Sequence, residues 1–398
     1  MALGALIGAY QEDESGGLTA LLPLVGRSLI EYQVRSAAAA GASPIVVLVE
    51  RIPAALNQAF ERLRGEGLNV VPVSDGNEAA TRFEPGELVL LIGDAIVPPL
   101  DLLTGLVDEQ EALVATVPDD ERHEDFERVD GVSRWSGVAL VEGRMLGATA
   151  AMLGDWDLPS TLLRRTMQGG ARLVPVAEES EPLLARNAED VARFERSILT
   201  ASRGGRDDLA SRYVLPLAED FATERLLDTA VRSEWLLYAA LALTFGAALC
   251  FTRGWLWAGL ALLLFSTPLD LIARRIGHIR LRPVASDAAA IRLLWPAAGL
   301  ALLALGWWEW RHGAGWGALL AAATCAAFAH AFAVERSHTD LPQPPWLFSR
   351  RNAILAALPF AIGNRWAAYL VLLSAYAAIS FFFVQFVVHR LRGELTAH

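Results

Sequence analysis

The segment LPLVGRSLIEYQVRSAAAAGASPIVVLVE, residues 22–50, decides the fold of the first half of the chain. Its alanine-rich middle carries an apolar face at helical spacing from Leu29 to Ala37, and Gly41 ends the predicted helix. The β-branched, continuously apolar run PIVVLVE (44–50) predicts a strand covered on both faces. A helix that leads into a buried strand is the repeating unit of an alternating α/β fold.

The same alternation extends to both sides of this segment. LGALIGAY (3–10) predicts a first buried strand, residues 53–67 a helix that ends in glycine, and residues 68–75 and 87–97 two further strands. The pattern predicts a Rossmann-like α/β domain with a mixed, largely parallel sheet. In such sheets, ligands bind outside the carboxyl ends of the strands.

Composition changes sharply along the 398 residues. Acidic residues crowd residues 1–233, whereas later residues are apolar with basic loops, so the net charge of −11 is a misleading average. We expect a domain over 1–200, a linker and interfacial helix over 201–233, and a membrane domain over 234–398. No basic stripe with interleaved aromatic residues is present, which argues against nucleic acid as a partner.

The second half predicts an α-helical bundle of six transmembrane spans. Most of the apolar segments approach the roughly 20 residues that a span needs. The fifth is short and contains Pro359, so it must extend into its flanks or form a broken helix. The six segments lie near 235–252, 255–273, 288–308, 314–334, 352–363 and 366–388.

The loop charges predict how this bundle is oriented. Arginines concentrate after the second predicted span, before the fifth and at the tail, which places both termini in the cytoplasm. The N-terminal apolar run lacks a basic flank, so we interpret it as a strand and not a signal peptide. The prediction is a multi-pass protein of the inner (plasma) membrane.

Between the halves, residues 204–234 carry apolar residues such as Leu209, Leu217 and Phe221 at intervals of one or two helical turns. This spacing suits a helix at the membrane surface, and an ordinary interdomain helix is the alternative. The two cysteines, Cys250 and Cys325, fall in predicted spans, where we expect small buried apolar residues and no disulfide or zinc site.

Residues 22–50, together with LVLLIGDAIV and RWSGVALVEGRML (134–146), resemble the nucleotidyltransferases that make nucleotide sugars and CDP-alcohols. The resemblance covers roughly residues 3–190. It implies that a nucleotide binds at the loop after the first strand, with Gly8, Gly16 and Gly17 as binding residues, and that Asp94 is a ligand of Mg²⁺. A strand-terminal aspartate that only caps a loop is the alternative for Asp94.

This loop departs from the family at the position where the triphosphate binds. Glu12, Asp13 and Glu14 replace a glycine-rich, arginine-bearing segment, and Thr19 stands at the position of the family's lysine. Three carboxylates repel a triphosphate unless metals intervene. The acidic stretch 118–130 contains His123, for which a solvated loop is favoured and metal binding is the alternative.

Six spans behind an interfacial helix resemble the CDP-alcohol phosphotransferases. Their signature, D-x-x-D-G-x-x-A-R followed by G-x-x-x-D-x-x-x-D, implies four carboxylates that hold divalent metals. When the signature is anchored on Ala273 and Arg274, Asp287 matches its third aspartate, and Asp270 approximates the second after a one-residue shift. The resemblance makes Asp287 and Asp270 the catalytic candidates, with Asp287 also a metal ligand.

Around these carboxylates, Arg274 and Arg282 are candidates to bind a phosphate or an anionic lipid headgroup. A simple orientation signal is the alternative for the arginines, and an ion pair with Arg274 is the alternative for Asp270.

Both resemblances together imply a fusion similar to the bifunctional enzymes that make a CDP-activated inositol phosphate and transfer it to a second alcohol. The first hypothesis is a transferase of phosphorus-containing groups, with Mg²⁺ as cofactor, a nucleotide or CDP-alcohol and a membrane lipid as partners, and a homodimeric state. The second, which the two eroded motifs favour, is a catalytically inactive scaffold or regulatory partner of an active paralogue. A transporter built on a six-span bundle is a third class.

Overall fold

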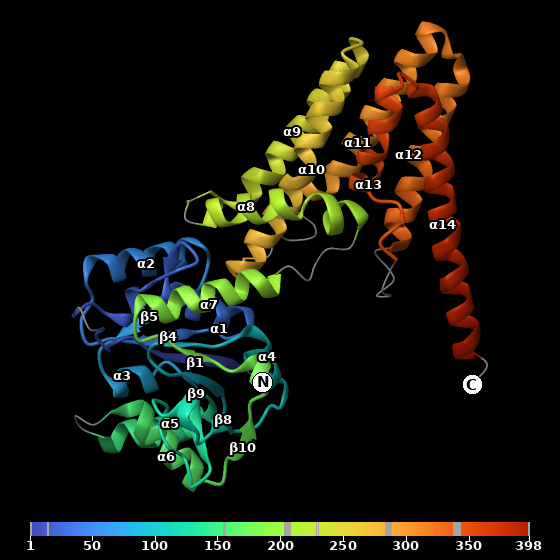
Figure 1. Cartoon of the computed structure of the whole chain (residues 1–398). Coiled ribbons are helices and arrows are strands. Elements are labelled where there is room, and N and C mark those ends of the chain that lie inside the picture. Colours follow the sequence, from blue (N-terminus) through green and yellow to red (C-terminus); the bar gives the residue numbers. More distant parts are fainter. Residues whose placement is uncertain are drawn as a thin grey trace. The chain divides into compact units, whose positions relative to one another are not determined.

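The computed structural model forms two compact units, Met1–Ala201 with Arg280–Arg282, and Ser202–Ile279 with Pro283–His398 (Figure 1). We refer to them as the α/β unit and the helical unit. The structure describes residues 2–13, 16–153, 157–202, 208–227, 229, 231–282, 289–336 and 344–396.

A seven-stranded mixed sheet forms the centre of the α/β unit, in the order β10-β8-β9-β6-β1-β4-β5. Strand β9 runs antiparallel to both of its neighbours, and the other pairings are parallel. The mixed sheet that the sequence predicts is therefore present. Its strands are β1 (Leu3–Gly8), β4 (Ile45–Leu48), β5 (Val70–Val73), β6 (Leu88–Ile92), β8 (Leu113–Pro118), β9 (Ser133–Glu142) and β10 (Arg172–Pro175).

Helices cover both faces of this sheet. In β6, Leu88, Leu90 and Ile92 enter one core, and Val89 and Leu91 enter the other, because successive side chains of a strand point to opposite faces. The helices are α1 (Leu29–Ala39), α2 (Ala54–Gly65), α3 (Gly76–Ala80), α4 (Leu100–Asp108), α5 (Gly143–Leu153), α6 (Leu158–Gln168) and α7 (Ala188–Ala201).

The predicted strand 87–97 is interrupted in the structure. It is divided at Gly93 and Asp94 into β6 and the two-residue β7 (Ile96–Val97), and Ala95 adopts a φ of 59°. Strand β7 pairs with β11 (Leu183–Leu184) in a separate ladder. The turn lies at the carboxyl end of β6, where the α/β fold places its ligands.

A buried carboxylate secures the start of α1. The Glu31 carboxylate accepts hydrogen bonds from the backbone and hydroxyl of Ser28, which form a capping box, and from the guanidinium of Arg62. Arg35 contacts Glu31 at 3.4 Å and pairs with Glu66 at 3.0 Å. Burial alone would raise the pKa of Glu31, but the hydrogen bonds from Arg62 and Ser28 lower it to about 2.

This lowered pKa predicts an acid-sensitive α/β unit. The folded-state pKa of Glu31 lies below its unfolded value, so its contribution to stability is complete above pH ~4.3 and is lost as the pH falls toward ~2. We expect Glu31→Gln to lower the free energy of unfolding near neutral pH by about 3 kcal/mol. The difference between wild type and variant, measured by thermal unfolding of the full chain, should shrink with acidification; a difference independent of pH would contradict this assignment.

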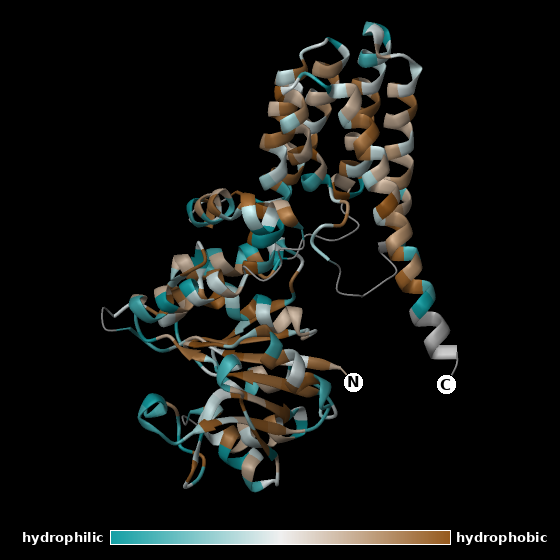
Figure 2. Cartoon of the chain, turned by 45° about the vertical axis from the view of Figure 1, so that its right-hand side comes forward, coloured by the Kyte–Doolittle hydropathy of each residue, from teal (hydrophilic) through white to brown (hydrophobic). Residues whose placement is uncertain are grey.

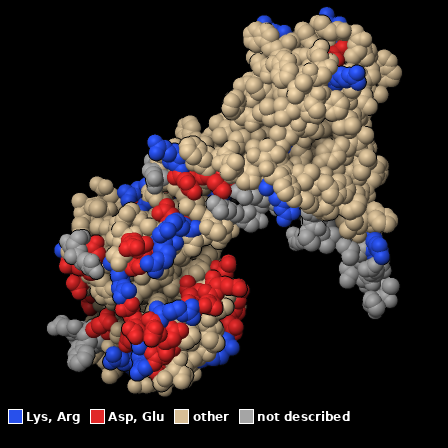
Figure 3. Space-filling model, in the orientation of Figure 1, with Lys and Arg blue, Asp and Glu red and all other residues tan. Residues whose placement is uncertain are grey.

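Within the described residues, the helical unit contains five helices that are long and apolar enough to cross a membrane, at Ser233–Thr252, Leu256–Ile279, Ala289–Ala314, Trp316–Glu335 and Trp366–Arg390. These segments support a multi-pass membrane protein. Their apolar colouring stands out in Figure 2, and Figure 3 shows few charged side chains on the visible face of this unit, whereas they are dense on the α/β unit. The corresponding elements are α9 (Ser233–Thr252), α10 (Leu256–Ile279), α11 (Ala289–Glu309), η6 (Trp310–Ala314), α12 (Trp316–Arg336) and α14 (Trp366–Thr396).

Two shorter elements complete the helical unit. Helix α13 (Arg350–Ile362) has 13 residues, about 20 Å in length, which is less than a span needs, so the sixth span remains a prediction. The segment 210–227 forms a π-helical turn, η5 (Ala210–Val214), and α8 (Pro216–Leu227). Its apolar side chains Leu217 and Phe221 are exposed, as a helix at the membrane surface requires, and that role also remains a prediction.

Candidate functional site

Asp94 ties the carboxyl end of β6 to the loop after β1. Its Oδ2 accepts hydrogen bonds from the backbone N–H groups of Tyr10 at 2.5 Å and Gln11 at 2.6 Å, and its Oδ1 accepts one from the hydroxyl of Thr19 at 3.2 Å. The side chain is buried. Burial raises the pKa of Asp94, although the hydrogen bonds oppose the shift. Backbone donors that could face a phosphate therefore face a carboxylate of the same chain.

The three predicted glycines lie around this contact. A Cβ on Gly8 would lie 3.2 Å from the Cβ of Asp94, so glycine permits the close approach of β1. Gly16, with φ of 78°, donates its N–H to the carbonyl of Asp13 at 3.0 Å. Gly17 donates its N–H to the carboxylate of Asp13 at 2.8 Å. The N–H groups of Gly16 and Gly17 are thus bonded within their own turn.

The surroundings of this loop are acidic. Tyr10 donates its hydroxyl to Asp157 at 3.1 Å. Burial, together with the charges of Asp157 and Asp94, raises the pKa of Tyr10 above its usual range. Glu12 pairs with Arg51 at 2.6 Å, and both side chains are half exposed. A polyanion that approached this end of the sheet would meet carboxylates on several sides.

In the helical unit, Asp270 of α10 lies in a buried ion-pair network. Its Oδ1 accepts a hydrogen bond from Arg350 at 2.9 Å, and its Oδ2 accepts one from Arg351 at 2.6 Å. Arg351 also binds Asp208 at 2.7 Å. Arg350 donates two further bonds to the hydroxyl and carbonyl of Ser266. Two arginines and two aspartates therefore balance in charge inside the unit.

A proline shapes α10 at this network. Pro268 lacks the N–H that would bond the carbonyl of Leu264 one turn earlier, and the hydroxyl of Thr267 donates to that carbonyl at 2.6 Å instead. A carbonyl oxygen has two lone pairs, so the carbonyl of Ser266 can accept from Arg350 in addition to a bond within the helix.

The other predicted residues of this region have different surroundings. Arg274 is exposed, and no ion pair joins it to Asp270 within the described residues, so the partners of Asp270 are the distant arginines of α13. Arg282 lies in the α/β unit and pairs with Glu66 at 3.2 Å. Arg275, which follows Arg274 in the sequence, is buried against Glu219 and Asp220 of α8. Asp287 lies outside the described residues.

His123, in the acidic stretch 118–130, is buried between two carboxylates. Its Nδ1 lies 2.7 Å from Asp120, and its Nε2 lies 3.2 Å from Glu181. The imidazole thereby links this stretch to the segment before β11. These two contacts give His123 a structural role.

The described residues do not fit a magnesium site. Mg²⁺ needs carboxylate lone pairs, whereas N–H and O–H donors point at the oxygens of Asp94 and guanidinium groups occupy those of Asp270. Within the described ranges, no group of three or more His, Cys, Asp or Glu side chains is placed to hold a metal ion.

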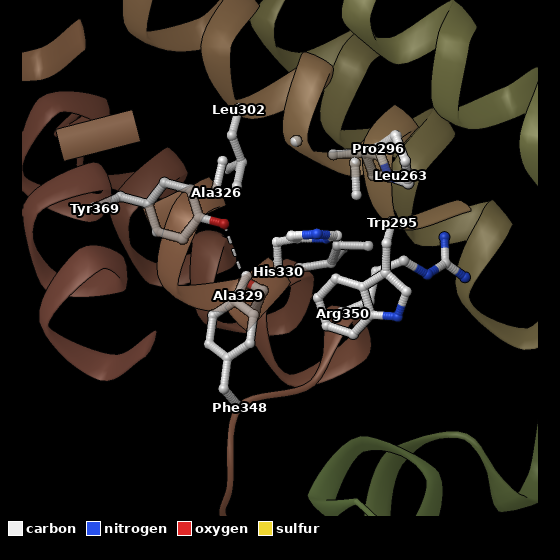
Figure 4. A pocket seen from close by; sticks show the side chains of 14 residues that line it. Leu263, Trp295, Pro296, Leu302, Ala326, Ala329, His330, Phe348, Arg350 and Tyr369 are labelled. Atoms are coloured by element: carbon white, nitrogen blue, oxygen red, sulfur yellow. Dashed lines mark hydrogen bonds between the residues drawn. The ribbon is translucent and has the colours of Figure 1, made fainter. Parts of the chain in front are cut away.

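A cavity of about 210 Å³ lies in the helical unit, and Arg350, which pairs with Asp270, is one of the side chains that line it (Figure 4). The close-up shows His330 of α12 among the aromatic side chains of Trp295, Phe348 and Tyr369. The Tyr369 hydroxyl donates to the carbonyl of Ala353 at 3.1 Å. The remaining lining residues are Leu263, Pro296, Ala298, Gly299, Leu302, Ala326, Ala329, Arg350 and Ile354.

Sequence analysis does not identify Asp208, His330, Arg350 or Arg351 as site residues. In the sequence, Arg350 and Arg351 count only among the loop charges that orient the bundle. A signal is nevertheless present, because a histidine inside an apolar segment marks a functional-site hypothesis. The pairing of Arg351 with Asp208 joins residues far apart in the chain, which no local pattern encodes.

No family model matches this chain, and no curated protein matches it. Among solved structures it is similar to the phosphatidylinositol phosphate synthase PgsA1 of Mycobacterium tuberculosis, which was solved with CDP-DAG bound. The similarity covers 44% of this chain and 92% of that chain, with 15% sequence identity and a TM-score of 0.36. This likeness is too remote to assign a family.

Proposed function

We propose that this chain is a membrane-anchored, non-catalytic protein of phospholipid-headgroup metabolism, which acts as a scaffold or regulatory partner. The observation that carries the proposal is the same at both candidate sites: the oxygens of Asp94 and Asp270 are held by donors of the protein itself. Each carboxylate is used to stabilise structure.

The chemistry of nucleotidyl and phosphoryl transfer explains why this matters. Such reactions depend on positioning and on neutralising phosphate charge, with metal-bound carboxylates and cationic or backbone donors around the phosphates. To ligate a metal, Asp270 would have to leave Arg350 and Arg351, which would leave two buried arginines with one aspartate, Asp208, to compensate them. Asp94 would have to release the two N–H groups that fix the loop after β1.

The proposal includes several features of the sequence interpretation. The α/β unit is a nucleotidyltransferase-like domain, and the helical unit is a six-span phosphotransferase-like bundle that forms a homodimer. Both termini face the cytoplasm at the inner membrane. Asp287, Arg274 and Arg282 are remnants of a site that once bound a CDP-alcohol and Mg²⁺.

Calorimetry and turnover assays on the full chain in phosphatidylcholine nanodiscs test the proposal. With Mg²⁺ present, we expect neither CTP nor CDP-diacylglycerol to bind, and no release of pyrophosphate or CMP with inositol phosphate as acceptor. Cooperative thermal unfolding of the same preparation serves as the control for folding. Mg²⁺-dependent CMP release that disappears in Asp287→Ala would overturn the proposal.

A scaffold also needs a partner. We expect the chain to co-purify with an active CDP-alcohol phosphotransferase when membranes are solubilised in a mild detergent. Recovery of the chain alone after chemical crosslinking in intact membranes would count against the scaffold role.

A further inference from the structure

The cavity contains an ionisable side chain that the rest of the unit does not use. No hydrogen bond or ion pair joins His330 to another described residue, and its side chain is exposed. It lies on a candidate span that ends at Glu335, five residues or about 7 to 8 Å further along the helix. An unpaired imidazole in an apolar span is costly, so a polar ligand group that bonds to it would be stabilising.

The walls of the cavity define the body of such a ligand. Leu302, Phe348 and Ile354 line it together with other apolar side chains, and none of the described aspartates or glutamates does. Gly299 leaves room on α11, because a Cβ built there would meet only Ala326 of α12, at 3.7 Å. A cavity of about 150 Å³ lined by aliphatic and aromatic side chains holds a benzene molecule, so 210 Å³ accommodates roughly eight carbon atoms.

The charges define the head of the ligand. Arg350 also lines the cavity, but Asp270 and Ser266 take three of its bonds, and Asp270 and Asp208 balance the two arginines. One imidazole remains. This imidazole matches one carboxyl group, because the two groups can form a hydrogen bond either as imidazolium and carboxylate or as imidazole and carboxylic acid. The two negative charges of a phosphate would be only partly compensated by one imidazolium.

We propose that this cavity binds a long-chain carboxylic acid, with its carboxyl group hydrogen-bonded to His330 and the adjoining carbons of its alkyl chain enclosed. The chain portion beyond the enclosed carbons lies along the apolar surface of the helices. The inference concerns binding by the helical unit and holds whether or not the protein transfers phosphoryl groups.

Photocrosslinking in nanodiscs tests the proposal, with a diazirine-bearing dodecanoic acid as the probe and mass spectrometry to locate it. We expect label on the peptides around Trp295 and Ala326 and competition by dodecanoic acid. The methyl ester should compete about tenfold or more weakly, because it cannot form the charge-assisted bond. Equal competition by the ester, or stronger competition by dodecyl phosphate, would overturn the carboxylate assignment.

Paired variants separate cavity binding from adhesion to the apolar surface. Ala326→Leu fills the cavity and should abolish labelling, whereas Ala327→Leu, on the adjacent exposed position, should leave it unchanged. His330→Gln keeps a polar side chain at an exposed position, so the protein should fold normally and bind the acid about tenfold or more weakly. Unchanged labelling of a folded Ala326→Leu or His330→Gln protein would refute the site.

Discussion

Asp270→Ala is expected to destabilise the helical unit by about 3 to 5 kcal/mol, the largest effect of any single substitution considered for this protein. The substitution leaves both arginines as buried cations: among the described residues, Arg350 keeps only Ser266 and Arg351 keeps only Asp208 as a partner. Unfolding of the full chain in detergent, followed by tryptophan fluorescence, measures the loss.

Two further variants make this result specific. Arg274→Ala removes an exposed charge one turn away and should change stability by less than about 0.5 kcal/mol. Replacing Asp270 and Arg350 together by Leu and Met should recover part of the loss, because apolar residues of similar size often substitute well for a buried ion pair. If Asp270→Ala were as stable as wild type, the network would not support the fold, and a chemical role for Asp270 would be favoured again.

Asp94→Ala is expected to cost the α/β unit about 3 kcal/mol, because it leaves the backbone N–H groups of Tyr10 and Gln11 without their acceptor, whereas the hydroxyl of Thr19 keeps the carbonyl of Gln11. Hydrogen exchange of the full chain should show faster exchange at Tyr10 and Gln11. The half-exposed Glu12, altered to Ala, provides a matched control on the same loop and should change little.

The choice between Asn and Ala at this position separates two roles of Asp94. Asparagine keeps a carbonyl oxygen for the two N–H groups and can donate its amide to Thr19, so a structural Asp94 predicts a nearly stable Asp94→Asn protein. A metal ligand would tolerate neither replacement. Mg²⁺-dependent nucleotide binding that Asn and Ala abolish equally would contradict the structural role.

The sequence predicts the regular parts of this fold because they depend on local pattern. The run 44–50 gives β4, residues 53–67 give α2 at Ala54–Gly65, and hydropathy alone finds the five long apolar helices. It does not predict the break between β6 and β7, since alanine is not a residue type that favours the positive φ that Ala95 adopts.

The partners of Asp270 cannot be predicted from local sequence pattern either, for a different reason. Arg274, one helical turn away, is the neighbour that the sequence offers, yet it is exposed, and the partners come from α13, 80 and 81 residues further along the chain. Which arginine reaches a carboxylate depends on how helices pack, and a single sequence does not encode that choice in any local spacing.

The contact of Asp94 with the loop after β1 can also be viewed as a competition. The Asp94 carboxylate, which belongs to the same chain, already accepts hydrogen bonds from the N–H groups of Tyr10 and Gln11. A phosphate that bound these groups would have to displace that carboxylate. Short tethers produce effective concentrations of millimolar or above. A free nucleotide at lower concentration would therefore have to bind these donors far more tightly than a carboxylate does.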